Sequence, residues 1–224
     1  MRPVPDKLRR AWLALSARRR YQVVLTLAVA FFVFAISWRD EYTARPYIVQ
    51  AVADELGYRQ VEDHAAAIRA AAEESEVDPL LIAAICFKES RGRSGQVSSA
   101  GAMGLMQLVE ASASDAARRL GIDTPTNDQL LNDAALNLRL GAAHIAWLLE
   151  HRGDWTMEQV LVAYNAGRSR LFQWIEAAGS YEAWVLQQEN KLHAGERTNG
   201  ALLYARGVLA TMERFRERGE ITGS

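Results

Sequence analysis

The first long apolar run of the chain extends from Tyr21 to Trp38 and contains no charged side chain. Its 18 residues approach the length of about 20 that a helix needs to cross the hydrocarbon core of a bilayer. Seven basic residues and the single acid Asp6 precede the run. Because basic residues are retained on the cytoplasmic side, the pattern predicts a single N-terminal transmembrane helix with the rest of the chain outside.

A cleaved signal peptide is the competing interpretation, because Ala35-Ile36-Ser37 places small residues at the spacing that a signal peptidase prefers. The apolar run is longer than the roughly 7–15 residues of an ordinary signal core, which favours the anchor. A buried core helix would leave the one-sided charge unexplained. Either of the first two interpretations exports the remainder of the chain.

The rest of the chain has apolar residues at helical spacing and no useful stretch of alternating apolar and polar residues, so the predicted fold is all-α. Asp78 and Pro79 form a helix start, with an N-cap followed by proline at the first helical position. A short helix is expected around Pro46 to Leu56, closed by Gly57. Further helices are expected over 62–76, 79–90, 111–120, 132–151, 157–166, 168–178, 181–192 and 201–216.

These patterns divide the 224 residues into one functional domain and its attachments, since domains usually have about 100–150 residues. We expect a basic cytoplasmic N-terminus, the transmembrane helix, a juxtamembrane connector, the main domain and a short tail, over 1–20, 21–38, 39–61, 62–216 and 217–224.

The formal net charge of −1 conceals an asymmetry. Without the basic first twenty residues, the chain carries about −7, which argues against binding to nucleic acid. Cys86 is the single cysteine, so no disulfide can form within the chain, and its apolar surroundings predict a buried packing role. The four histidines show no metal-ligand spacing with Glu or Cys, so no metal is expected.

Glu89 stands out as a candidate acid because it comes just after the strongly apolar stretch 80–87. Gly92 and Gly95 follow it and indicate a loop. Burial against apolar neighbours disfavours the charged form of a carboxyl group and raises its pKa. A carboxylic acid with a raised pKa can protonate the departing oxygen of a glycosidic bond at neutral pH.

Three separated motifs surround this candidate: Glu89-Ser90 with Ser98, then Gly-Ala-Met-Gly-Leu-Met-Gln at 101–107, and Ala-Tyr-Asn-Ala-Gly at 163–167. Asn137 and Gly141 add a fourth element on the helix between them. Over about 62–216 the sequence closely resembles the lytic transglycosylases, a family with a lysozyme-like helical fold. The order and spacing of the motifs match the family without an insertion.

The resemblance implies an enzyme that cleaves the β-1,4 bond between N-acetylmuramic acid and N-acetylglucosamine in peptidoglycan and leaves 1,6-anhydro-muramic acid ends. Glu89 would act first as the acid and then as the base that removes the proton of the C6 hydroxyl. No second acid lies inside the motifs. The tethered C6 hydroxyl removes the need to position a water molecule.

The resemblance also suggests a substrate-binding set. Ser90 and Gln107 would orient the acid or the N-acetyl group, Met106 would line the sugar subsite, and Tyr164 with Asn165 would hold the −1 sugar. The remaining members are Ser98 and Tyr204, of which Tyr204 would hydrogen-bond Glu89.

The chain departs from the family's usual residues at four places, which concern the lining of the cleft and the substrate preference. Gly92 stands where the family usually has Phe, Glu110 where it has Pro, and His144 where it has Tyr. Gly200-Ala201 replaces a Glu-Thr segment ahead of Tyr204.

The expected partners are therefore peptidoglycan glycan strands and the membrane, without a cofactor and with no protein partner indicated. The expected location is the bacterial cytoplasmic (inner) membrane, crossed once, with the enzyme domain on the periplasmic or outer side. Two alternatives stay open: a lysozyme-type hydrolase on the same fold, and a non-catalytic peptidoglycan-binding scaffold.

Overall fold

The computed structural model describes Thr26 and residues 45–223. The chain divides into two compact units, Met1–Asp54 and Glu55–Ser224. The predicted transmembrane helix at 21–38 lies outside the described residues except for Thr26. None of the helices in the described part of the chain combines the length and apolarity that a bilayer span requires.

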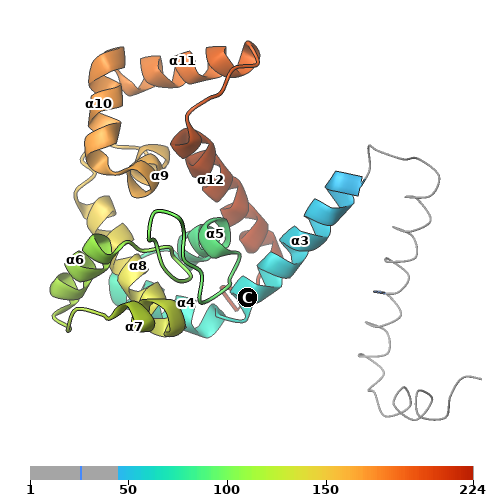
Figure 1. Cartoon of the computed structure of the whole chain (residues 1–224), viewed down its shortest axis with the longest axis vertical. Coiled ribbons are helices and arrows are strands. Elements are labelled where there is room, and N and C mark those ends of the chain that lie inside the picture. The colour runs from blue at the N-terminus through green and yellow to red at the C-terminus, as the bar shows by residue number, and fades with distance from the viewer. Residues whose placement is uncertain (1–25, 27–44, 224) are drawn as a thin grey trace, which may run out of the picture. The chain divides into compact units, whose positions relative to one another are not determined.

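The secondary structure of the described residues is helical apart from two isolated β-bridges, which join Val97 to Met103 and Met103 to Leu108. Figure 1 shows the helices in chain order. Their bounds are α3 Arg45–Glu62, α4 Ala65–Ser75, α5 Pro79–Ser90, α6 Glu110–Leu120, α7 Asn127–Asn132, α8 Ala134–Glu150, α9 Met157–Ala166, α10 Arg168–Ala178, α11 Tyr181–His193 and α12 Gly200–Arg218.

Two predicted boundaries are wrong. The helix expected to close at Gly57 continues to Glu62, and the long helix expected to begin at residue 132 is preceded by the separate helix α7. Gly57 lies within α3, and a Cβ there would lie 2.9 Å from the ring of Phe87, so glycine at this position allows α3 to pack closely on α5. Asp133 ends α7 and caps α8, since its side chain accepts from the backbone N–H of Leu136.

Helix α5 supplies the centre of the core in the unit Glu55–Ser224. Nine of its twelve residues are buried, and it packs against α4, α8 and α12. A small aromatic cluster closes one side, where Tyr58 stacks on Phe87 at 4.3 Å and both meet the edge of Phe215. Cys86 is completely buried as predicted, and burial raises the pKa of its thiol to about 12. The thiol is therefore a packing group.

Helices α9 to α12 complete the domain. Helix α9 packs against both α8 and α12, and α10 packs against α9 and α11 (Figure 1). A capping box starts α9. The Thr156 side chain accepts from the backbone N–H of Gln159, and the Gln159 side chain accepts from the backbone N–H of Thr156. The capping box fixes the start of the helix whose C-terminal end carries the motif at 163–167.

Candidate active site

Glu89 lies in the last turn of α5, immediately before the chain leaves the helix. The C-cap residue Arg91 adopts the left-handed conformation, with φ of 55°, and its backbone N–H donates to the carbonyl of Phe87. Ser90 fixes this helix end, because its hydroxyl reaches the carbonyl of Leu105 at 2.9 Å and that of Cys86 at 3.1 Å. The carboxyl group of Glu89 is thus carried by a buried and anchored helix.

The segment 91–109 folds back over α5 and is held by the amide of Asn137, which is 1% exposed. Its Oδ1 accepts from the backbone N–H of Met106 at 2.8 Å, and its Nδ2 donates to the carbonyls of Met103 and Leu130. One side chain on α8 therefore fixes the loop to both α7 and α8.

Two glycines allow this close approach. A Cβ at Gly104 would lie 2.3 Å from the Asn137 amide nitrogen, and a Cβ at Gly141 would lie 2.8 Å from the Met106 side chain. Gly104 also has φ of +76°, a conformation that other residues rarely adopt. The Asn137 and Gly141 motif therefore has a structural explanation, since both residues seat the loop that faces Glu89.

The cavity that contains Glu89, called the Glu89 cleft below, has a volume of about 570 Å³ and lies between the loop, α8 and the end of α9. Glu89 is its only carboxylate among the described residues. Its lining is formed by Glu89, Ser98, Ala100, Ala102, Gln107, Leu108, Val109, Ser112, His144, Trp147, Leu148, Ala163, Tyr164, Asn165, Ala166, Gly167 and Arg168.

Burial raises the pKa of Glu89 to about 7, because desolvation disfavours the carboxylate. The Tyr204 hydroxyl counteracts part of this rise, since a hydrogen bond from it favours the charged form. This hydroxyl is buried and has no other hydrogen-bond partner within the described chain, so its donor is available to Glu89. Lys88 also lowers the pKa of Glu89, by a smaller Coulombic effect. The result is a carboxyl group that can release or take up a proton near neutral pH.

Four members of the predicted substrate-binding set line the cleft beside Glu89: Ser98, Gln107, Tyr164 and Asn165. Three of them also stabilise the loop. Ser98 accepts from the backbone of Ala102, Gln107 donates to the carbonyls of Gly104 and Gln96, and Tyr164 donates to the carbonyl of Met106 at 3.0 Å.

The other three predicted residues lie behind the cavity wall. Met106 is fully buried with its side chain against Gly141, and Ser90 is 2% exposed with its hydroxyl turned to backbone carbonyls. Tyr204 comes from α12, on which α5 and α9 also pack, and its pKa is raised by its burial and the charge of Glu89.

Trp147 and Arg168 line the cleft but were not singled out from the sequence, whereas His144 was noted there only as a departure in the cleft lining, without a role of its own. His144 and Trp147 continue the face of α8 that begins with Asn137 and Gly141, at spacings of three or four residues, so this helical face was the available signal. Burial lowers the pKa of His144 to about 4, and the charge of Arg119 adds to this effect. His144 is therefore neutral and stacks on Trp147.

The Glu89 cleft adjoins a second hollow of about 700 Å³, and the two share Ala100 and Val109 in their walls. Glu110, where the family usually has Pro, lines this neighbouring hollow. The two cavities therefore lie side by side along the loop.

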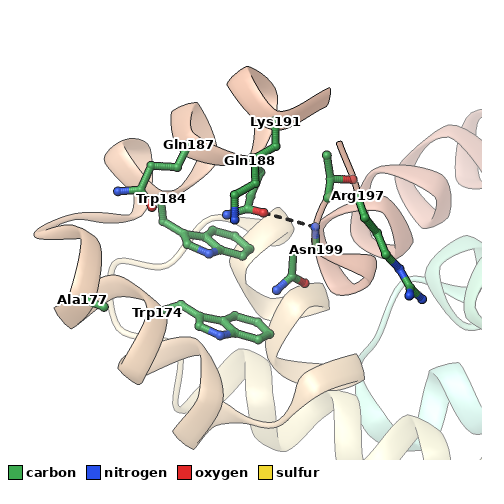
Figure 2. Close-up of a pocket in the computed structure, with 9 residues that line it drawn as sticks. Trp174, Ala177, Trp184, Gln187, Gln188, Lys191, Arg197 and Asn199 are labelled. Atoms are coloured by element: carbon green, nitrogen blue, oxygen red, sulfur yellow. Dashed lines mark hydrogen bonds between the residues drawn. The ribbon is translucent and has the colours of Figure 1, made fainter. Parts of the chain in front are cut away.

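A further cavity of about 420 Å³ lies between α10, α11 and the segment leading into α12 (Figure 2). The rings of Trp174 and Trp184 stack there at 5.3 Å, and Gln188 accepts from the backbone of Asn199. Its lining contains Lys191 and Arg197 but no described carboxylate, so this cavity offers no general acid. Across the described residues, no cluster of three or more His, Cys, Asp or Glu side chains could hold a metal ion.

Comparison with known proteins decides the family. Residues 66–187, more than half of the chain, match the transglycosylase SLT domain family. The chain belongs to this family. The resemblance drawn from the motifs is thereby confirmed. The matched range includes Glu89, the loop and the motif at 163–167, and it ends within α11.

A transglycosylase of Enterobacteria phage PRD1 is 34% identical over 125 residues, which cover 56% of this chain and 42% of the phage protein. The chain thus spans less than half the length of this relative. Among solved structures, an inactive mutant of the lytic transglycosylase Slt from Pseudomonas aeruginosa superposes with a TM-score of 0.59 at 25% identity. The match covers 70% of this chain and 24% of the Pseudomonas protein.

The 70 kDa soluble lytic transglycosylase of Escherichia coli has the same fold, with a TM-score of 0.55 at 23% identity over 68% of this chain and 24% of its own. The all-α lysozyme-like fold is therefore confirmed for the described domain, as a part of what these larger relatives contain.

Proposed function

We propose that this chain cleaves the β-1,4 bond between N-acetylmuramic acid and N-acetylglucosamine of peptidoglycan without hydrolysis and forms 1,6-anhydro-muramic acid ends. The observation that carries the proposal is the Glu89 cleft, in which a single carboxyl group has its pKa raised to about 7 by burial. Family membership supplies the substrate class.

Glu89 acts first as the acid. Its proton passes to the glycosidic oxygen while the bond between that oxygen and C1 of the muramic acid breaks, and positive charge develops at C1. The N-acetyl group of the same sugar stabilises C1. Glu89, now a carboxylate, removes the proton of the C6 hydroxyl as the C6 oxygen bonds to C1. The ring closes, Glu89 is again protonated, and no water molecule is consumed.

The absence of a second described carboxylate in the cleft supports this sequence of steps. Ordinary two-carboxylate glycosidases place the second acid roughly 5–10 Å from the first, as a nucleophile or as the base that activates water. Here one carboxyl group serves both steps, and a tethered hydroxyl replaces the water.

The surrounding residues then divide into two roles. Gln107, Tyr164 and Asn165 face the cavity and hold the sugar on the muramic side of the bond, while Ser98 shapes the loop wall. Tyr204 hydrogen-bonds the carboxylate form of Glu89 and so favours release of its proton. For Ser90 and Met106, burial favours a supporting role behind the wall.

The proposal also includes an anchor at 21–38 that keeps the domain on the outer face of the cytoplasmic membrane, near its polymeric substrate. The basic cluster before the apolar run supports this orientation. Cell fractionation of the full chain and of residues 39–224 tests it, because only the full chain should sediment with membranes and resist extraction by salt. If expression of the full chain instead yields a protein that is free of membranes and begins near residue 37, the apolar run is a cleaved signal peptide.

The catalytic assignment is tested by release of soluble fragments from purified peptidoglycan by the wild-type chain, Glu89→Gln and Glu73→Gln. Glu73 is an exposed residue on α4, away from the cleft, and serves as the matched control. Glu89→Gln should reduce the rate by at least about 10³-fold, whereas Glu73→Gln should retain it. Comparable rates for all three proteins would refute Glu89 as the acid.

A further inference from the structure

Arg168 occupies one end of the Glu89 cleft and is held there by aromatic rings. The centre of its guanidinium group lies 5.1 Å from the Trp147 ring, 5.5 Å from Trp155 and 6.0 Å from Phe172. Its Nη2 also donates to the carbonyl of His151 at 3.2 Å, just beyond the end of α8. These contacts fix the position of the cation, since an arginine stacked on several rings has few alternative rotamers.

No described Asp or Glu forms an ion pair with the guanidinium group of Arg168. Six other arginines in the described part of the chain do form ion pairs, at positions 59, 118, 139, 206, 216 and 218. A guanidinium group has five N–H donors, and the contact with His151 uses one of them. The half-buried side chain therefore presents unused donors at the rim of the cleft.

The surroundings strengthen the positive charge at this end. Arg119 lies 4.5 Å from the Trp147 ring, also without a described ion pair, and its charge contributes to the lowered pKa of His144. Asp115, the nearby acid, pairs with Arg118. Two arginines without a described ion pair therefore flank Trp147 at this end of the cleft, in a chain that is acidic beyond its first twenty residues.

We infer that Arg168 forms a subsite for a carboxylate of the peptide stem carried by the muramic acid in the cleft. This inference rests on the proposed function. Each stem begins at the lactyl group of the muramic acid, leaves the glycan strand sideways and bears free carboxylates. A planar guanidinium group can bind a carboxylate through two parallel hydrogen bonds, which a fixed Arg168 offers at the rim. Strands with charged stems should therefore bind better than bare strands.

The test measures kcat and KM of the full chain on three soluble glycan strands: with intact stems, with stems whose carboxylates are converted to amides, and with stems removed. Arg168→Gln is compared with wild type and with Arg168→Lys, which keeps the charge but not the planar pair of donors. Arg170→Gln is the matched control, because Arg170 is an exposed arginine on the same helix and does not line the cleft. Thermal unfolding shows whether each variant is folded.

Arg168→Gln should raise KM about tenfold or more on strands with intact stems, with kcat nearly unchanged and little effect on the other two substrates. Arg168→Lys should lie between wild type and Arg168→Gln, and Arg170→Gln should behave as wild type. An equal loss on all three substrates would overturn the inference, because Arg168 would then only shape the cleft. A loss on amidated as well as intact stems would also overturn it, since the contact would not depend on a carboxylate.

A direct titration separates this inference from the proposed function. If wild type cleaves none of the strands, the proposed function fails, and binding of a soluble stem peptide to the full chain then tests the subsite alone. Weaker binding to Arg168→Gln than to wild type and Arg170→Gln would support the subsite, whereas equal binding to all three would refute it.

Discussion

Glu89 is a carboxyl group in a setting that makes its charged form costly. It lies in the last turn of a helix with nine buried residues, where a charge is costly, and no described residue forms an ion pair with it that would keep it ionised. Lys88 is adjacent in sequence but is exposed, and its effect on the pKa is smaller than that of burial. Under the proposed function, this carboxyl group serves the chemistry at the expense of stability.

The pH dependence of activity should follow the protonation of Glu89. Its pKa of about 7 means that the acid form needed for the first step is present below pH 7 and is lost above it, so the rate should fall on the alkaline side. Tyr204→Phe removes a hydrogen bond that favours the carboxylate and should move this alkaline limb to higher pH. Rates measured from pH 5 to 9 check both statements, and an unmoved limb in the variant would exclude contact between Tyr204 and Glu89.

Glu89→Gln should stabilise the domain at alkaline pH. The folded-state pKa is raised from 4.5 to about 7, so the unfolded chain binds fewer protons between these values and stability falls as pH rises through them. The full penalty is about 3 kcal/mol above pH 7 and disappears below about pH 4.5. Denaturant unfolding at pH 8 and pH 4.5 should show a gain in the free energy of unfolding at pH 8 only. A similar gain at both pH values would contradict the burial argument.

At the level of single residues, the sequence predicted the burial of Glu89 but not the direction in which each neighbouring side chain points. The apolar stretch before Glu89 was sufficient to predict its burial. Whether Met106 faces the sugar or α8 depends on where Gly141 lies in space, and the chain order does not give that. Arg168 and Trp147 meet only because α8 and α10 converge at the cleft.

The reason why Gly92 stands where the family usually has Phe also depends on which residues lie close to it in space. A Cβ at this position would lie 2.5 Å from the backbone nitrogen of Val61 at the end of α3, and the residue has φ of +74°. The larger Phe that the family usually carries there would displace this part of α3. Glycine at this position therefore accompanies the close packing of α3.

Among the elements, α8 has the largest influence on the cleft, because it supports the loop through Asn137 and lines the cavity through His144 and Trp147. The helices with clear start and stop signals, such as α5 after Asp78-Pro79 and α9 before Gly167, were predicted with their observed bounds. Helix α7 was missed because its six residues are too few to show a period.

Asn137→Ala should destabilise the domain by about 3 kcal/mol, because it leaves the N–H of Met106 and the carbonyls of Met103 and Leu130 buried without partners. Asn132→Ala, at an exposed site, should change stability by less than about 0.5 kcal/mol. Urea unfolding of both variants measures the difference. If Asn137→Ala were as stable as Asn132→Ala, the loop would be held by other contacts.

At the scale of the whole molecule, the compact unit begins at Glu55, whereas the family match begins at residue 66. Three contacts explain the earlier start. Tyr58 stacks on Phe87, Val61 is fully buried, and Arg218 near the end of α12 pairs with Glu55 and Glu62. The domain start predicted from the sequence, residue 62 of the range 62–216, is later than Glu55. The apolar pattern alone does not show that the end of α3 packs against α5 and α12.

A fragment of residues 55–224 should therefore unfold in one cooperative transition, and a fragment of residues 63–224 should be less stable by at least about 3 kcal/mol, since it loses Val61 and Tyr58. Differential scanning calorimetry of the two fragments makes the comparison. Equal melting temperatures would show that the last two turns of α3 are not part of the folded domain.

The central claim is that one carboxyl group cleaves the glycan without water, and mass spectrometry of the products tests it most directly. Purified peptidoglycan is digested with the full chain, and the released fragments are weighed. The account predicts fragments one water lighter than hydrolysis products, which carry no reducing end and are absent when Glu89→Gln replaces the wild type. Fragments with reducing muramic acid ends would contradict it and would make the chain a lysozyme-type hydrolase.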